Sequence, residues 1–158
     1  MSASVKKPKS FGIWGNTDKT RFWKLLDPIM EWAEEKKISP FITKRIREKI
    51  GNESNYKFNV IESAEDFYKI DFLLTLGGDG TMLSAARAVG HRKTPILGIH
   101  LGELGFMAEV TVDEMFSRLD MVLAGSYGLQ RRMVLKAEIV NGEGLKVFYA
   151  LNDFVIDR

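Results

Sequence analysis

The stretch Leu73–Thr81, which reads LLTLGGDGT, constrains the fold of this chain more than any other. A run of mostly apolar residues leads directly into two glycines, an aspartate, a third glycine and a threonine. Apolar residues then recur at the three- and four-residue spacing that predicts a helix: Met82, Ala85, Ala86 and Val89. The stretch therefore predicts a buried strand, a tight turn and a helix.

A turn of this kind favours the binding of phosphate. The first amides of a helix and the positive end of its dipole attract anions. Glycines let the backbone approach a phosphate closely. Asp79 would repel phosphate, so its position is explained if its carboxylate holds a metal ion or accepts a proton from an attacking hydroxyl. This chemistry indicates phosphoryl transfer. The alternative is that the glycines serve the geometry of the turn alone.

Two other phosphate-binding motifs do not fit the stretch. A Walker loop requires a lysine followed by serine or threonine after the last glycine, and Thr81 follows Gly80 directly. The dinucleotide-binding fingerprint would require a third glycine where Leu83 stands. The phosphate site is therefore of a different class.

The composition excludes several other classes of protein. The hydrophobic content of 45% and charged content of 28% are those of a globular protein. A net charge of +2 is too small to indicate nucleic-acid binding, and the absence of cysteine excludes disulfides and thiol catalysis. No signal peptide or membrane-spanning run is present in the sequence, so we expect a cytoplasmic protein with neither nucleic acid nor membrane as a partner.

Residues 1–126 alternate predicted strands and helices. This alternation predicts an α/β domain with a Rossmann-like parallel sheet and flanking helices. The predicted strands are 10–14, 38–42, 58–61, 72–76 and 96–100, and the main helices begin near Thr17, Thr43, Met82 and Thr111. Pro28 predicts a kink or break in the first helix, and Pro40 predicts that the second strand lies at a sheet edge or is a short piece.

Residues 127–158 follow a different pattern. Apolar and polar residues alternate up to Asn141-Gly142, a strong hairpin signal, and a returning strand is predicted over 145–156. We expect these residues to begin an antiparallel β domain that is truncated at Arg158. Asn152 and Asp153 would then be buried polar residues in an apolar strand, and a bound ligand would supply their partners.

Three ordered motifs resemble those of ATP-dependent NAD kinases. They are Gly77-Gly78-Asp79-Gly80-Thr81, then the stretch from Gly98 to Phe106, which reads GIHLGELGF, and then Leu151-Asn152-Asp153. The first motif also occurs in lipid kinases of the diacylglycerol kinase type. The second motif differs from the loop expected in lipid kinases and favours the NAD kinases.

The resemblance implies a role for each matching residue. Asp79 would be the general base near the 2′-hydroxyl of the adenosine ribose of NAD. Gly77, Gly78, Gly80 and Thr81 would bind phosphates, and Gly80 would also contact NAD. Phe106 would border the adenine, while Asn152 and Asp153 would hold the adenine and the ribose hydroxyls. His100 is interpreted as structural, since the family more often has asparagine there.

The implied function is the transfer of phosphate from ATP or polyphosphate to NAD, which gives NADP. Mg²⁺ or another divalent metal would be the cofactor, and the full-length protein would be a homo-oligomer, a dimer or a tetramer. The family's second domain carries a further nucleotide-binding motif that this sequence lacks, so we expect the 158-residue chain alone to be inactive. The alternatives are a lipid kinase and a non-catalytic nucleotide-binding module.

Overall fold

The computed structural model describes residues 7–51, 54–102, 105, 107–108, 110–141 and 144–156. The chain separates into two compact units, Met1–Tyr127 and Gly128–Arg158. The first unit contains a six-stranded sheet and the second a two-stranded sheet.

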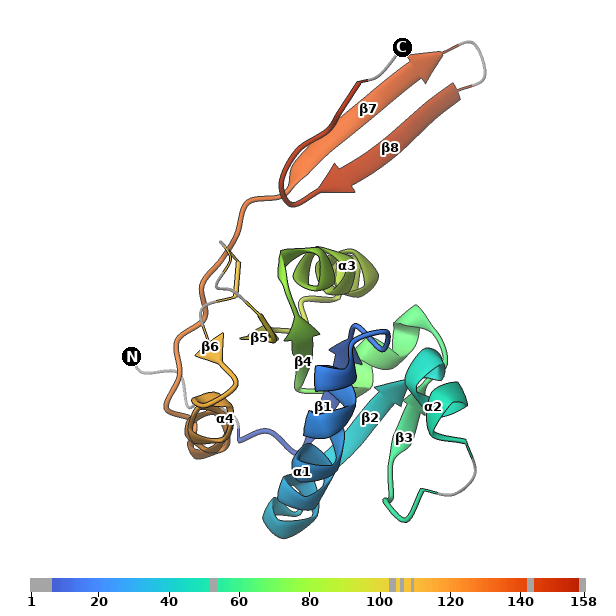
Figure 1. Cartoon of the computed structure of the whole chain (residues 1–158). Helices are drawn as coiled ribbons and strands as arrows, with labels where there is room; N and C mark the ends of the chain where they lie inside the picture. Colours follow the sequence, from blue (N-terminus) through green and yellow to red (C-terminus); the bar gives the residue numbers. More distant parts are fainter. Residues whose placement is uncertain are drawn as a thin grey trace. The chain divides into compact units, whose positions relative to one another are not determined.

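The six-stranded sheet is parallel throughout and has the strand order β3-β2-β1-β4-β5-β6 (Figure 1). This is the strand order of dinucleotide-binding folds, and it confirms the predicted Rossmann-like architecture. The strands are β1 (Ser10–Gly15), β2 (Ser39–Thr43), β3 (Asn59–Ile61), β4 (Phe72–Gly77), β5 (Ile96–His100) and β6 (Val110–Thr111). The helices are α1 (Thr20–Lys36), α2 (Lys44–Ile50), α3 (Asp79–Val89) and α4 (Met115–Ala124), with 3₁₀ turns η1 (Ala64–Lys69) and η2 (Gly90–Arg92).

Helices cover both faces of the sheet because successive side chains of a strand point in opposite directions. In the fully buried strand β4, Leu74 and Leu76 pack in the core cluster that contains residues of α1, α2 and α4. Leu73 packs on the other face with Ala85 and Val89 of α3 and with residues of η1. The continuous apolar run that predicted this strand is thus explained by burial on both sides.

The structure shows neither a break at Pro28 nor an edge position for the strand that contains Pro40, but that strand is short, as the alternative prediction allowed. Helix α1 continues through Pro28, and it begins at Thr20 after Lys19, without a capping side chain from Thr17 or Asp18. Strand β2 lies between β1 and β3, although it contains Pro40. The Ser39 N–H donates to the Lys9 carbonyl on the β1 side, so the nitrogen of Pro40 faces the β3 side. The pairing of β2 with β3 starts only at Phe41, so the missing N–H of Pro40 removes no hydrogen bond between these two strands.

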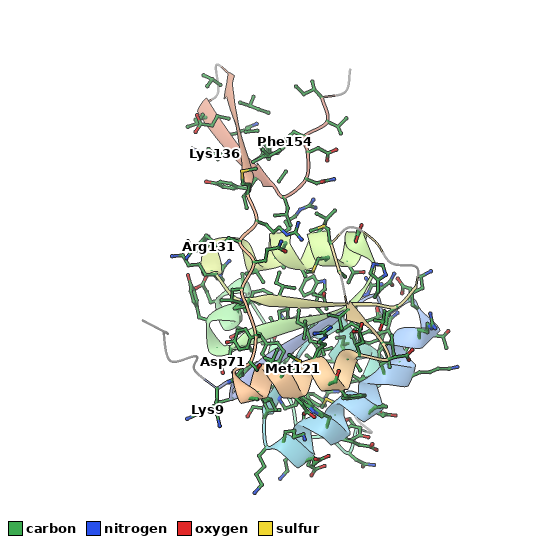
Figure 2. The ribbon with its side chains drawn as sticks, turned by 90° about the vertical axis from the view of Figure 1, so that its left-hand side faces the viewer. Lys9, Asp71, Met121, Arg131, Lys136 and Phe154 are labelled. Atoms are coloured by element: carbon green, nitrogen blue, oxygen red, sulfur yellow. The ribbon has the colours of Figure 1, made fainter. Side chains whose placement is uncertain are left out.

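Asp71 connects the first strand to the turn before β4. Its Oδ2 accepts hydrogen bonds from the Lys9 N–H at 2.8 Å and from the Ser10 N–H at 3.1 Å. Figure 2 shows Lys9 and Asp71 side by side at this point. These bonds align the starts of the two central strands, whose carboxyl ends carry the site described below.

The second unit is a hairpin of β7 (Leu135–Asn141) and β8 (Gly144–Ala150), which pair antiparallel as predicted. The returning strand is shorter than predicted, because β8 ends at Ala150 and not at Ile156. Asn152 and Asp153 therefore lie beyond the strand, and both are exposed, so the prediction that they are buried was wrong. A two-stranded hairpin has no second layer of its own to bury them. Figure 2 labels Phe154 in this unit, and its side chain is 40% exposed.

In the part of the chain that the structure describes, no helix is both long and apolar enough to span a membrane.

Asp66 gives the first unit a specific dependence on pH. Its carboxylate accepts hydrogen bonds from Lys69 Nζ at 2.6 Å and from the N–H groups of Ser63 and Glu62, and these lower its pKa to about 2. A pKa below the unfolded value of 3.8 stabilises the fold at neutral pH, and this stability is lost as the pH falls from about 4 to about 2. Asp66→Asn should lower the free energy of unfolding at pH 7 by roughly 2 kcal/mol. Urea unfolding at pH 7 and pH 3 measures this, and an equal loss at both pH values would contradict the assignment.

Candidate functional site

The Gly-Gly-Asp-Gly-Thr turn lies at the centre of the sheet. Strand β4 ends at Gly77, Gly78 caps α3, and the helix starts directly at Asp79, three residues earlier than Met82. The N–H groups of Thr81 and Met82 donate to the Gly78 carbonyl at 3.0 and 3.1 Å. The turn therefore presents the N-terminus of α3 beside the carboxyl end of β1, where the strand order reverses. Ligands of such sheets bind at this point.

The glycines at the site fall into two groups. At Gly77 a Cβ would lie 2.1 Å from Thr81 Oγ1, and at Gly105 it would lie 2.4 Å from Asp79 Oδ1. At these two positions a side chain would collide with that of Thr81 or Asp79. A Cβ at Gly78 or Gly80 would meet nothing within 4 Å. Their missing side chains leave open space at the helix N-terminus, which is what a phosphate would need.

A cleft of ≈ 470 Å³ opens at the carboxyl ends of β1, β4 and β5. It is lined by Asn16, Lys19, Thr20, Arg21, Gly77, Gly78, His100, Leu101 and Gly102. Among the described residues, this lining includes two cationic side chains, Lys19 and Arg21, and no carboxylate. Arg21 Nη1 donates to the Leu101 carbonyl, which joins the start of α1 to the segment after β5. A cleft with this lining is suited to an anion.

Asp18, next to Lys19 in the chain, has its own cationic partners. It accepts from Lys49 Nζ at 2.9 Å and from Arg45 Nη2 at 2.6 Å. The hydrogen bond from Lys49, followed by that from Arg45, holds the pKa of Asp18 below its ordinary value. Its negative charge is thus offset by these two side chains and opposes an anion in the cleft less than an isolated carboxylate would.

Asp79 is held by the segment that follows β5. Its side chain is 33% exposed, and its Oδ1 accepts a hydrogen bond from the Met107 N–H at 3.1 Å. His100 Nε2 lies 3.9 Å from the same oxygen and accepts from the Gly105 N–H at 2.7 Å. A partly exposed, oriented carboxylate at the N-terminus of a helix could accept a proton from a bound hydroxyl.

The structure brings together only part of the set of predicted residues. Asp79, Gly80 and Thr81 lie in the first turn of α3, and Gly77 and Gly78 line the cleft. Phe106 lies outside the described residues. Asn152 and Asp153 belong to the second unit, so the described geometry does not join them to this site.

Sequence reasoning missed the contribution of the first strand and helix to the cleft. Asn16, Lys19, Thr20 and Arg21 line it because β1 is the neighbour of β4. The local signal was present in the turn-like Gly15-Asn16 at the end of the first strand. Which strand lies next to β4 depends on long-range pairing, and no local pattern reveals it.

Among the residues that the structure describes, no group of three or more His, Cys, Asp and Glu side chains could hold a metal ion. Of the described residues at this site, Asp79 offers a carboxylate that could contact a metal. Mg²⁺ in phosphoryl-transfer sites is commonly held by one or two carboxylates together with substrate phosphates. A single carboxylate fits a metal ion that is bound mainly by the phosphates of a substrate. It does not fit a metal ion that is held by protein side chains alone.

Comparison with known proteins gives consistent results. A family model described as "ATP-NAD kinase N-terminal domain" matches residues 11–127. The NAD kinase of Caldanaerobacter subterraneus subsp. tengcongensis is 34% identical over 151 residues, which are 95% of this chain and 52% of that protein. The NAD kinase of Geobacter metallireducens is also 34% identical, over 95% of this chain and 51% of that protein. The chain spans about half the length of the curated relatives it matches.

Two solved structures share the fold. One is yeast NADH kinase complexed with NADH, with a TM-score of 0.79 and 19% identity, covering 96% of this chain and 52% of the yeast chain. The other is an NAD kinase from Archaeoglobus fulgidus in complex with ATP, with a TM-score of 0.51 and 16% identity, covering 82% of this chain and 40% of that one. At these identities the likeness establishes the architecture.

Proposed function

Because this chain belongs to the ATP-NAD kinase family through its N-terminal domain, we propose that the complete protein phosphorylates the 2′-hydroxyl of the adenosine ribose of NAD and so produces NADP. The donor is ATP or inorganic polyphosphate. The observation that carries the proposal is the position of Asp79, which is oriented at the N-terminus of α3 beside an anion-suited cleft. We assign the activity to the complete protein, since the chain spans about half of its relatives.

In this proposal the residues of the chain position the two reactants and accept one proton. Asp79 accepts the proton of the ribose hydroxyl while the hydroxyl oxygen attacks the terminal phosphorus of the donor. The bond between this phosphorus and the leaving phosphate breaks. Gly78 and Gly80 leave room for phosphates at the helix N-terminus, assisted by Gly77 and Thr81. Mg²⁺, bound to the donor and within reach of Asp79, would neutralise charge on the donor phosphates.

The remaining contacts to NAD come from residues that the described site does not contain. We propose that Phe106 borders the adenine and that Asn152 and Asp153 bind NAD, on the resemblance of their motifs. We also propose a cytoplasmic homo-oligomer, a dimer or a tetramer, as the working form. Light scattering on the complete protein measures its mass.

The direct test is to incubate the complete gene product with NAD, ATP and Mg²⁺ and to measure NADP with an NADP-specific dehydrogenase. NADP that accumulates in proportion to enzyme supports the proposal. A parallel reaction with diacylglycerol vesicles tests the lipid kinase alternative. A folded protein that phosphorylates the lipid and not NAD would overturn the proposal.

The cationic lining of the cleft gives a prediction about the donor. Lys19→Gln should raise the KM for ATP about tenfold, because a charge-assisted contact to phosphate contributes roughly 1.5 kcal/mol. The KM for NAD should change much less. Lys24→Gln removes the same charge from an exposed position of α1 and should change neither the KM for ATP nor the KM for NAD. An unchanged KM for ATP in Lys19→Gln would show that the donor phosphates bind elsewhere.

A further inference from the structure

Two backbone amides, those of Gly105 and Met107, contact two acceptors beside the cleft. The Gly105 N–H donates to His100 Nε2 at 2.7 Å, and the Met107 N–H donates to Asp79 Oδ1 at 3.1 Å. The two acceptor atoms lie 3.9 Å apart. Gly105 and Met107 are therefore held at two neighbouring points, one of which is the proposed base.

The hydrogen bond from Gly105 determines which nitrogen of His100 carries the proton. Because Nε2 accepts an N–H, the neutral ring is protonated at Nδ1. The Nε2 lone pair is already used by Gly105, and 3.9 Å is too long for a hydrogen bond to Asp79. His100 in this state does not exchange a proton with the carboxylate, so a role as the base or as a relay does not fit the geometry.

His100 also carries an unsatisfied polar atom. The side chain is 6% exposed, and Nδ1 is buried with no hydrogen-bond partner among the residues that the structure describes. An unpaired buried polar group is unfavourable for folding. The unpaired Nδ1 thus lowers the stability of the fold, whereas Nε2 anchors Gly105 beside Asp79.

We infer that His100 is a positioning residue, whose Nε2 anchors Gly105 and thereby fixes the Met107 N–H that orients the Asp79 carboxylate. The segment lies close against this carboxylate, since a Cβ on Gly105 would come within 2.4 Å of Asp79 Oδ1. Movement of the segment therefore moves the donor to Asp79. The inference rests on the proposed function for its catalytic consequence.

Two substitutions separate anchoring from packing. His100→Phe keeps a planar ring and removes both nitrogens, so the anchor is lost together with the unsatisfied Nδ1. His100→Gln keeps an acceptor, because its Oε1 is three bonds from Cβ, as Nε2 is in histidine. His91→Phe makes the same change at an exposed position in η2 and is the matched control.

In the complete protein, His100→Phe should lower kcat about 10²-fold, the effect of misplacing a catalytic group by about 1 Å. Its KM for NAD should change less than threefold, because the lost interaction orients Asp79 and does not bind substrate. His100→Gln should retain kcat within about fivefold, and His91→Phe should match the wild type. A folded His100→Phe protein with wild-type kcat would overturn the inference, as would equal impairment of the Phe and Gln variants.

A second readout does not depend on activity. Amide hydrogen exchange of Gly105 and Met107, measured on the ligand-free protein, should be faster in His100→Phe and close to wild type in His100→Gln. Unchanged exchange in His100→Phe would overturn the anchoring role, whatever the enzyme does. If the wild type makes no NADP, the proposed function fails, and the exchange result still decides whether His100 anchors the segment. If His100→Phe does not fold, loss of protection in His100→Gln refutes the inference and retention supports it.

Discussion

Asp79→Asn should reduce NADP formation by the complete protein by a factor of about 10² to 10⁴ while leaving its affinity for NAD within a few-fold of the wild type. Asparagine keeps the size of the side chain and its acceptor oxygen for the Met107 N–H, but it cannot take up the proton of the ribose hydroxyl. The expected loss is therefore in kcat. Steady-state NADP formation measures the rate, and calorimetric titration with NAD measures the affinity.

The control for this experiment is Asp113→Asn, which removes a carboxylate from an exposed position before α4 and should leave kcat unchanged. An Asp79→Asn protein with near-normal turnover would refute the assignment of the base. A wild-type protein that binds NAD and forms no product under any donor would support the non-catalytic nucleotide-binding module instead.

Gly105→Ala should have a comparably specific effect on catalysis. The new Cβ would lie 2.4 Å from Asp79 Oδ1 and 2.7 Å from Cγ, so either the carboxylate must rotate or the segment must move away. Either change breaks the present geometry between Asp79 and the Met107 N–H. Because a misplacement of about 1 Å can reduce a rate about 10²-fold, we expect kcat to fall by this factor.

The global fold should tolerate this substitution, since the clash is with the end of a short and partly exposed side chain. Thermal unfolding should therefore show a Tm within a few degrees of the wild type. Gly128→Ala introduces the same methyl group where nothing lies within 4 Å and should affect neither Tm nor kcat. A Gly105→Ala protein with wild-type kcat would mean that the carboxylate orientation is unimportant for turnover.

The parts of the fold that could be predicted are those in which local sequence and burial agree. The run from Phe72 to Leu76 is apolar because both faces of β4 are covered, so its pattern alone identified a central parallel strand. The internal position of the short strand with Pro40 could not be predicted, because the direction in which the proline nitrogen points depends on pairing with β1, and no local pattern gives that direction.

The site was predictable only where one stretch of sequence contains it. The turn from Gly77 to Thr81 identified the helix N-terminus and the carboxylate, while the cations contributed by α1 depend on which strand lies next to β4. His100 was interpreted as structural because the family more often has asparagine there, and nothing in the local sequence places its Nε2 beside Asp79 and Gly105. Asn152 and Asp153 were assigned to a buried strand from alternation, which cannot tell whether a covering layer exists.

The pairing of β1 with β4 has a consequence for the order of folding. Ser10 and Asp71, which align these strands, are 61 residues apart, so their pairing closes a long loop and loses chain entropy before the contacts offset it. The neighbouring β1, α1 and β2 are continuous in sequence and can assemble without that closure. The cleft forms only after this loop has closed, so a partly folded chain lacks the proposed nucleotide site. A bound nucleotide should then slow unfolding and leave the rate of folding nearly unchanged.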